Sequence, residues 1–461
     1  MTTDELRESL LMAPRNGYAR ITAEQKAEME SYCRNYMAFM DACKTEREAT
    51  AWTVREAEKR GFKPFTPGMD AKAGDKIYFD NRGKSIMVAV VGTAPLSRGA
   101  NICAAHVDSP RMDIKPNPLY EDSEIAYLKT HYYGGIKKYQ WVTVPLALHG
   151  VVYRKDGTMV SITIGEDDSD PILMVSDLLI HLSANQMQET AAKAIKGEQL
   201  NVIMGTEPLE GEGGDLVKLH IMKLLNEKYG LIEADFLSAE LTIVPAGKSR
   251  EVGLDRSLIA AYGHDDRVCA YAELDAIFNI ETPSKTAVCI LADKEEIGSV
   301  GISGMQSEAF EYFMGTLCAA QGVDLRECFA NSFCLSADVS NAYDPNFPEV
   351  HDRRNNSQVN YGISITKYTG RAGKGGASDA SAEVMGHVRT TLDNAGVIWQ
   401  IATLGKVDQG GGGTVAAYMA NRNIPTVDAG VPVLSMHAPL ELVSKLDCYE
   451  TMLACKALYL A

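Results

Sequence analysis

The chain has 461 residues, of which 46% are hydrophobic, and a formal net charge of −16. A chain of this length exceeds the size at which one hydrophobic core usually divides, so two domains are expected. The acidic balance argues against binding to nucleic acid or to an anionic membrane surface, and no run of about 18 apolar residues occurs that would span a bilayer.

The ten cysteines are scattered between Cys33 and Cys455, and none forms a Cys-x-x-Cys pair. Several lie within apolar runs, so we expect reduced and buried side chains. A thiol nucleophile at Cys103, three residues before His106, is disfavoured because a thiol in a buried run is normally inert. The amino terminus lacks the basic and then apolar profile of a signal peptide. The protein is therefore expected in the cytoplasm.

Helix and strand patterns alternate over the first hundred residues. Thr45-Glu-Arg-Glu48 is a capping box, which predicts a helix through Arg60, with Gly61 after its end and Phe62 packing back on it. The apolar run Ser85–Val91 predicts a strand.

The residue composition changes between about Lys115 and Thr242, where Tyr-rich and turn-rich segments replace the alternating helix and strand patterns. Val151–Ile164 predicts a hairpin around Asp156-Gly157, and the polar, glycine-rich run Gly205–Asp215 is typical of a long mobile loop. We expect residues 115–241 to form an inserted, smaller β-rich domain. A simple lid over an active site would also explain this segment.

The alternating pattern returns after about Leu241. It predicts a strand ending at Ala292, helices near Val268–Asn279, Ser307–Gln321 and Ala377–Val388, and a final helix through Tyr459. Strands alternating with helices indicate an α/β fold with a mainly parallel sheet sandwiched by helices. Residues 1–114 and 242–461 together are the predicted discontinuous catalytic domain.

Metal-ligand residues stand at the ends of five apolar runs. Because ligand sites of open α/β sheets lie outside the carboxyl ends of the strands, these side chains are candidates for one shared site. Each also has a structural explanation, since a lone histidine is often a buried hydrogen-bonded residue and paired aspartates often cap a helix. Imidazole and carboxylate ligands together suit zinc, cobalt or manganese. The candidates are His106 with Asp108, Asp265 with Asp266, Glu295 with Glu296, Asp338, and His437.

These motifs, in this order, resemble those of the aspartyl aminopeptidase family of co-catalytic dizinc peptidases. The specific ones are His106-x-Asp108-Ser-Pro and Glu295-Glu296-Ile-Gly-Ser. The resemblance covers nearly the whole chain and implies a zinc exopeptidase-like fold with two divalent metal ions, zinc or else cobalt or manganese.

The resemblance also implies a role for each metal ligand. Asp265 would bridge the two ions, His106 and Asp338 would complete one site, and Glu296 and His437 would complete the other. Relatives often carry Asn at the position of Asp266, so the resemblance leaves open whether Asp265 or Asp266 bridges the two ions. We prefer Asp265.

Three further roles follow from the resemblance. Glu295 would be the general base, and Asp108 would hydrogen-bond the far nitrogen of His106. Gly412, Gly413 and Thr414, in the run Gly410–Thr414, would let the backbone approach the substrate closely.

The expected chemistry is hydrolysis of the amino-terminal residue of peptides. Two ions roughly 3.5–4 Å apart share and activate a water molecule, Glu295 moves its proton, and a free substrate amine binds one metal. A carboxypeptidase or amide deacylase with the same metal pair is the alternative. An inactive structural or binding protein on this fold is the third hypothesis.

Departures from the family pattern leave the preferred first residue open. Trp141–Pro145 differs from the corresponding stretch in eukaryotic relatives, and Asp177 stands where they have a histidine that is thought to reach a neighbouring active site. Lys367 or Lys374 would be able to pair with an acidic substrate side chain, although surface lysines are the simpler interpretation.

The resemblance finally implies an assembly. The inserted domain would build dimers that close into a dodecamer, whose interior admits peptides and excludes folded proteins. Peptides are therefore the expected substrates, and neither nucleic acid nor membrane is an expected partner.

Overall fold

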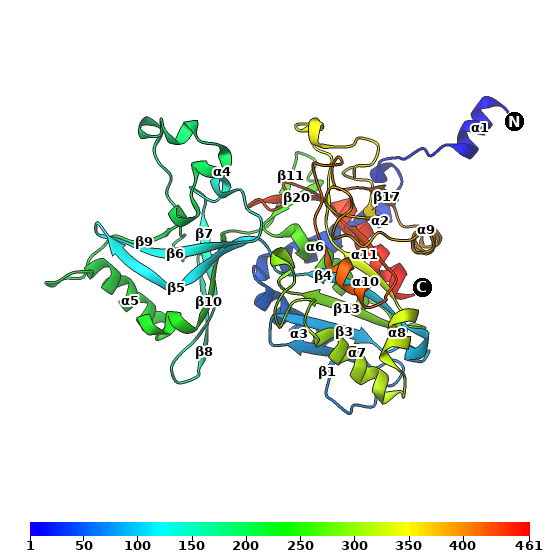
Figure 1. The fold of residues 1–461 in the computed structure, drawn as a ribbon, viewed down its shortest axis with the longest axis horizontal. Helices are drawn as coiled ribbons and strands as arrows, with labels where there is room; N and C mark the ends of the chain where they lie inside the picture. The colour runs from blue at the N-terminus through cyan, green and yellow to red at the C-terminus, as the bar shows by residue number, and fades with distance from the viewer.

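Two bodies of different size make up the structure (Figure 1). The larger one contains a nine-stranded sheet covered by helices, and the smaller one contains a six-stranded sheet. The structure is a computed structural model that describes residues 1–461.

The large sheet has the strand order β1-β2-β3-β13-β4-β14-β18-β16-β17. Its four central strands, β13, β4, β14 and β18, are parallel to one another. Antiparallel pairs occur only toward the edges, where β3 pairs with β2 and β13, and β16 pairs with β18. The strands are β1 (Lys63–Pro64), β2 (Lys76–Asn81), β3 (Ser85–Val90), β4 (Ala100–His106), β13 (Thr286–Ala292), β14 (Phe333–Ala337), β16 (Ile363–Thr366), β17 (Trp399–Ala402) and β18 (Thr426–Gly430).

Strand β13 shows why helices cover both faces of this sheet. All seven of its residues are buried, and successive side chains of a strand point to opposite faces. Ala287, Cys289 and Leu291 accordingly enter one hydrophobic core, while Val288, Ile290 and Ala292 enter a second. The mainly parallel, helix-covered sheet expected from the sequence is therefore confirmed.

Each core is closed by its own set of helices. The first is covered by α2 (Ala23–Ala42), α3 (Glu46–Lys59), α6 (His264–Phe278), α9 (Ala382–Ala395) and α11 (Lys445–Tyr459). The second is covered by α7 (Ala309–Ala320), α8 (Leu325–Asn331) and α10 (Val415–Asn421).

The smaller body is a β-rich insert with a core of its own. All its strand pairs are antiparallel, in the order β8-β7-β10-β5-β6-β9. The first strand of this sheet begins at Arg111 and the last ends at Pro245, so the sheet extends a few residues beyond 115–241. The elements are β5 (Arg111–Asp122), β6 (Ile125–Tyr133), β7 (Leu146–Tyr153), β8 (Met159–Ile164), α4 (Ala191–Ala194), β9 (Val202–Gly205), α5 (Leu216–Tyr229) and β10 (Ala239–Pro245).

A third sheet was not predicted. It has the order β11-β12-β20-β19-β15. Its strands are only two to four residues long, too short to show an alternating pattern, and two of its four pairs, β12 with β20 and β15 with β19, join segments far apart in the sequence. They are β11 (Arg250–Val252), β12 (Leu258–Ala261), β15 (Ser340–Asn341), β19 (Pro432–Leu434) and β20 (Glu441–Ser444).

Predictions that rested on short sequence motifs, a capping box and a hairpin turn, are confirmed. The capping box at Thr45 forms, and Phe62 is buried after Gly61; the predicted hairpin forms with Tyr153 opposite Met159. The helix predicted over Ala377–Val388 is wrong in its bounds. It begins at Ala382, because the Ser381 side chain accepts the Val384 backbone N–H and caps the helix there.

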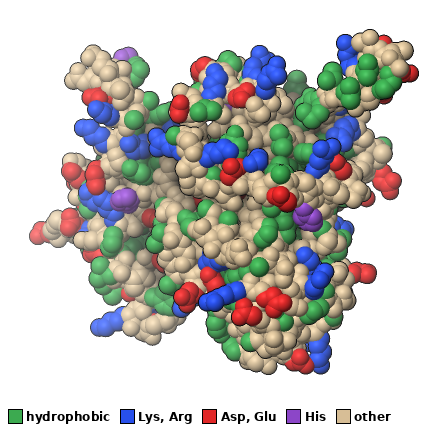
Figure 2. All heavy atoms as spheres, turned by 45° about the vertical axis from the view of Figure 1, so that its right-hand side comes forward, with side chains coloured by type: hydrophobic (Ala, Val, Ile, Leu, Met, Phe, Trp, Pro, Cys, Tyr) green, Lys and Arg blue, Asp and Glu red, His purple; other side chains and the backbone are tan.

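The amino-terminal helix α1 (Thr3–Leu10) projects away from the rest of the chain (Figure 1) and has no buried residue. Acidic and basic side chains are interspersed over the face drawn in Figure 2. Among the helices, none combines the length and the apolar content that crossing a membrane requires.

Candidate metal centre

Three neighbouring strands of the large sheet deliver their metal-ligand residues to one edge. Strands β13, β4 and β14 are parallel, and their register places Ala292 beside His106, the last residue of β4. Asp338 follows β14 directly, and Glu295 and Glu296 form a short 3-10 turn after β13. Because the strands run in the same direction, their carboxyl ends coincide and these side chains converge.

Asp265 lies at the centre of the cluster, at the start of α6. Its backbone angles and those of Asp266 are not helical, so the regular helix begins at Arg267. One carboxylate oxygen of Asp265 lies 3.2 Å from Nε2 of His106, and the other lies 3.1 Å from Nε2 of His437. The carboxylate therefore stands between two imidazoles, one on each oxygen.

The remaining carboxylates surround this arrangement. Glu296 Oε1 lies 3.5 Å from Nε2 of His437, and Glu295 Oε2 lies 3.8 Å from Nε2 of His106. Two sets of three ligand atoms fall within 4.8 Å of one another: His106, Asp265 and Glu296, and His106, Asp266 and Asp338. The structure thus brings together all five residues predicted as metal ligands, with Asp266 beside them.

The hydrogen bonds and charges of the cluster fit divalent cations. Asp266 Oδ1 and Glu296 Oε1 are buried and have no hydrogen-bond partner within the protein. Burial raises the pKa of Glu295 to about 7, and burial together with neighbouring carboxylates raises the pKa values of Glu296 and Asp338 well above their ordinary range. Buried carboxylates need positive partners, and a mixed nitrogen and oxygen donor set is one that zinc accepts.

Both imidazoles are held by a backbone carbonyl at the nitrogen that faces away from the carboxylates. His106 Nδ1 lies 2.9 Å from the carbonyl oxygen of Asp108, and His437 Nδ1 lies 2.8 Å from that of Gly135. A carbonyl only accepts, so each Nδ1 carries the proton and donates it. Each Nε2 is then free to ligate a metal ion, which is the arrangement that metal-binding histidines adopt.

Asp108 contacts His106, but not mainly through the atom that was expected. Its carboxylate Oδ1 lies 3.5 Å from His106 Nδ1, farther than its own backbone carbonyl. The two carboxylate oxygens instead accept the backbone N–H groups of Glu295 and Glu296, at 3.1 and 3.2 Å, and Oδ2 also accepts the hydroxyl of Tyr133 at 2.7 Å. Asp108 therefore positions the Glu295–Glu296 turn.

Glu441 is a residue of this centre that the sequence analysis missed. It is buried, and its two carboxylate oxygens accept the backbone N–H groups of Asp265, at 3.1 Å, and of His437, at 2.6 Å. It thereby ties the start of α6 to the connection between β19 and β20. Burial and the charge of Asp265 raise the pKa of Glu441 to about 8. Its position four residues after His437 carried no recognisable signal.

The predicted glycine-rich segment makes no hydrogen bond to the metal-ligand side chains. Thr414 caps α10, and its hydroxyl donates to the buried Asp428 at 2.6 Å. Side chains added at Gly412 and Gly413 would meet open space. Lys367 and Lys374 both donate to one carboxylate, that of Asp379, at 2.6 and 2.9 Å.

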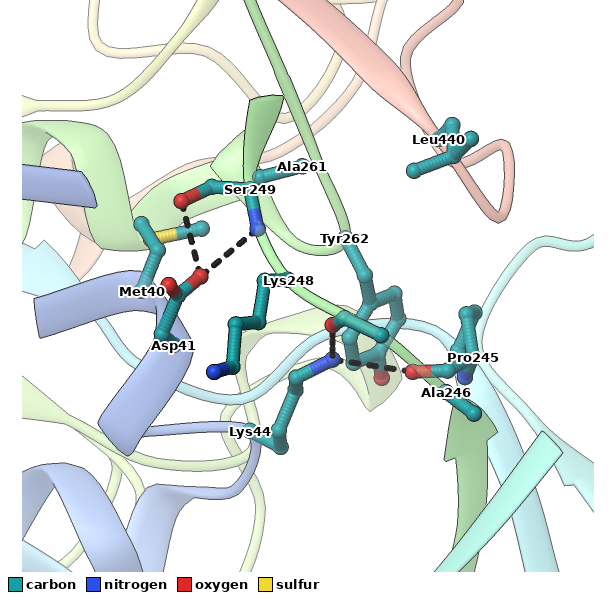
Figure 3. Close-up of a pocket in the computed structure, with 11 residues that line it drawn as sticks. Met40, Asp41, Lys44, Pro245, Ala246, Lys248, Ser249, Ala261, Tyr262 and Leu440 are labelled. Carbon is teal, nitrogen blue, oxygen red and sulfur yellow. Dashed lines mark hydrogen bonds between the residues drawn. The ribbon is translucent and has the colours of Figure 1, made fainter. Parts of the chain in front are cut away.

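A pocket that none of the candidate metal ligands lines lies where the large body meets the insert (Figure 3). Lys44 Nζ donates there to the backbone carbonyls of Pro245 and Gly247, at 2.9 and 2.6 Å. Asp41 accepts both the backbone N–H and the hydroxyl of Ser249, at 2.6 and 2.7 Å. These charged groups already have partners within the chain, so the metal cluster is the better candidate site.

Comparisons with known proteins agree with this geometry. A sequence model of the peptidase family described as "Aminopeptidase I zinc metalloprotease (M18)" matches residues 39–459. A protein of Clostridium acetobutylicum named "Probable M18 family aminopeptidase 1" is 48% identical over 451 residues, which cover 96% of this chain and 97% of that protein.

Solved structures resemble this chain over almost its whole length. The crystal structure of an M18 family aminopeptidase from Thermotoga maritima superposes with a TM-score of 0.93 at 43% identity, covering 97% of this chain and 99% of that one. The structure of the S. cerevisiae mApe1 dodecamer has a TM-score of 0.76 at 20% identity, covering 94% of this chain and 98% of that one, and shows a shared fold.

Proposed function

We propose that the protein uses two divalent ions per chain to remove the first residue of peptides. The chain belongs to the M18 family of zinc metalloproteases and is a metal-dependent aminopeptidase. One observation carries this proposal. The two oxygens of Asp265 each face a different imidazole, at 3.2 and 3.1 Å. A carboxylate whose two oxygens face different imidazoles suits a bridge between two ions, with one histidine on each ion.

The ligands divide into two sets around Asp265. His106 and Asp338 belong to one ion, and Glu296 and His437 belong to the other. Asp266 is less suited to bridge, since one of its oxygens accepts the backbone N–H of His106 at 3.3 Å and it lies on the side of Asp338. Zinc is the metal that the family description names, and cobalt or manganese would suit the same donors.

Glu295 is the general base in this proposal. Burial raises the pKa of Glu295 to about 7, and neighbouring cations would lower it again, so that the carboxylate is ionised and able to accept a proton at neutral pH. It takes a proton from the attacking water and delivers it to the nitrogen of the leaving amine. Bound in this cluster, the ions would polarise the peptide carbonyl, lower the pKa of the water and accept the free α-amino group of the substrate.

Gly412, Gly413 and Thr414 are proposed to contact the substrate backbone. No atom lies within 4 Å of a Cβ added at either glycine, so the backbone of both residues is open to a bound peptide. The hydrogen bond from Thr414 to Asp428 anchors the end of this segment on β18, two strands from β4 in the large sheet.

Metal counting and substrate blocking test the function together. Elemental analysis of the purified protein should find about two zinc ions per chain. Peptides with a free amino terminus should be cleaved, and the same peptides with an acetylated amino terminus should not. Undiminished cleavage of blocked peptides would favour a carboxypeptidase or amide deacylase instead, and a protein without tightly bound metal would contradict the proposed centre.

The insert is proposed to join copies of this chain into dimers and a dodecamer. Supporting this, the insert exposes several large apolar side chains in one segment, and the S. cerevisiae relative of the same fold is a dodecamer. Light scattering should then give a mass near 600 kDa for twelve chains of 50.1 kDa, and Ile180→Asp should yield a smaller species. The segment includes Leu178, Leu179, Ile180, Leu182 and Met187.

We also propose that the enzyme works in the cytoplasm. All ten cysteines are buried and free, which suits a reducing compartment.

A further inference from the structure

The insert returns to the metal centre through one short segment, Tyr133–Gly135. Strand β5 leaves the centre three residues after Asp108, and β6 comes back antiparallel to it, with Tyr133 opposite Arg111. The open end of this hairpin therefore lies against the metal ligands although its strands belong to the insert. The three residues of the segment each contact a different part of the centre.

Gly135 contacts His437. Its carbonyl oxygen accepts the Nδ1 proton of that imidazole at 2.8 Å, and a Cβ at this position would lie only 3.3 Å from the same nitrogen. His437 sits in a loop between the short strands β19 and β20, with a backbone φ of 66°. The insert supplies the hydrogen bond that sets which nitrogen of His437 is free.

Tyr133 contacts the other side of the centre. Its hydroxyl donates to Asp108 at 2.7 Å, and the same carboxylate accepts the backbone N–H groups of Glu295 and Glu296. The Tyr133 ring is buried beneath the guanidinium of Arg111, 4.2 Å from its centroid. This packing fixes the direction in which the hydroxyl points.

Gly134 completes the contact. Its φ is +73°, and a Cβ there would lie 3.4 Å from both the Cβ and Oε2 of Glu296. The backbone thus passes directly alongside a metal ligand, which a larger residue would displace.

We propose that Tyr133–Gly135 is a positioning segment of the metal centre, by which the insert orients His437 through Gly135 and the Glu295–Glu296 turn through Tyr133 and Asp108. The inference rests on the two-ion centre proposed above. The insert then has a role in each chain's own active site, besides any contact with other copies. Partners of this kind typically change metal affinity or activity by about 10–100-fold when altered.

Gly135→Ala tests the first contact with the metal alone as the probe. Its φ lies outside the left-handed region, so the added methyl strains no backbone but pushes the imidazole by a few tenths of an ångström. Competition with a chelator should show one of the two zinc ions bound at least about tenfold more weakly, and the visible absorption of the cobalt-substituted protein should change. Gly214→Ala, in the same insert with open space around it, should match the wild type in both measurements.

Tyr133→Phe tests the hydrogen bond from Tyr133 to Asp108. The substitution adds no atoms, so it still tests the proposal if Gly135→Ala fails to fold. It should lower kcat by about tenfold or more with little change in KM, because the base turn and not peptide binding is disturbed. Tyr153→Phe, at an exposed tyrosine of β7, is the matched control.

Wild-type zinc affinity and cobalt spectrum in Gly135→Ala, or wild-type kcat in Tyr133→Phe, would overturn the inference. A wild-type protein that binds no pair of ions would instead refute the proposed function.

Discussion

Two clusters of histidines and carboxylates in this chain differ in how their charges are balanced. At the junction of the large body and the insert, His149 lies between Glu48, at 2.7 Å, and Glu166, at 3.0 Å, and Lys44 lies 3.4 Å from Glu166. Two negative groups meet two positive ones there. The metal centre instead gathers Asp108, Asp265, Asp266, Glu295, Glu296 and Asp338 around only two imidazoles, His106 and His437.

The difference separates a structural cluster from a functional one. The charged groups at the junction find partners within the chain, so they hold the insert against α3 and need nothing further. At the metal centre an excess of carboxylates remains, and two of their oxygens are buried without a partner. A buried excess of carboxylates must either take up protons, as the raised pKa values of Glu296 and Asp338 indicate for the cluster by itself, or be balanced by cations.

Of the changes considered, removing the metal should have the largest effect on activity. It should disturb the metal centre and leave the cluster around His149 unchanged. After treatment with a chelator, peptidase activity should fall to background, because the carboxylates lose the charge that balances them. Thermal unfolding should shift to a lower temperature, and adding zinc should restore both properties. Full activity in protein shown by elemental analysis to be free of metal would contradict this account of the centre.

Glu295→Gln should separate catalysis from metal binding. The amide keeps the size of the side chain but cannot take a proton, so turnover should fall by at least about a hundredfold. The zinc content should remain at the wild-type value. Glu296→Gln is the matched comparison, and it should lose metal as well as activity. If Glu295→Gln stays active while Glu296→Gln does not, the two roles are reversed.

Glu441→Gln should weaken metal binding without removing a ligand. The carboxylate accepts two backbone N–H groups, whereas an amide has one oxygen and turns an N–H₂ toward the other donor. Zinc affinity, measured by chelator competition, should fall by about tenfold or more. Glu450→Gln is a suitable control, because Glu450 is also buried and accepts a backbone N–H, that of Ile398, away from the centre. Equal affinities in the two variants would remove the role assigned to Glu441.

His149→Gln should change stability and leave metal binding intact. Although burial acts against it, the hydrogen bonds to Glu166 and Glu48 raise the pKa of His149 to about 9, above its ordinary value of about 6.5. The stabilisation is therefore complete below about pH 6.5 and is lost as the pH rises through about 9, and it amounts to about 3 kcal/mol.

Thermal unfolding of the zinc-saturated wild type and the His149→Gln variant, followed from pH 6.5 to 9.5, measures this contribution. The melting temperature of the wild type should fall more steeply over that range than that of the variant. Parallel curves would mean that His149 carries no charge in the folded protein.

The sequence predicted well the elements whose causes are local. The apolar run Thr286–Ala292 became β13 and the capping box at Thr45 became the start of α3, because alternation and capping depend on neighbours in the chain. The helix at Ala382 was misplaced since its Ser381 cap was not recognised. The short strands on either side of His437 were missed because, at three and four residues, they are too short to show an alternating pattern.

The kinds of residue in the centre, and the order in which they follow the apolar runs, could be recognised from the sequence by itself, together with the family they indicate. Only the tertiary structure decided which atoms meet: that Asp265 lies between two imidazoles, that Glu441 ties two ligand segments together, and that Gly135 supports His437 across 302 positions of chain. Backbone carbonyls and N–H groups make many of these contacts. Nearly every residue carries such groups, so only the path of the folded chain determines where they act.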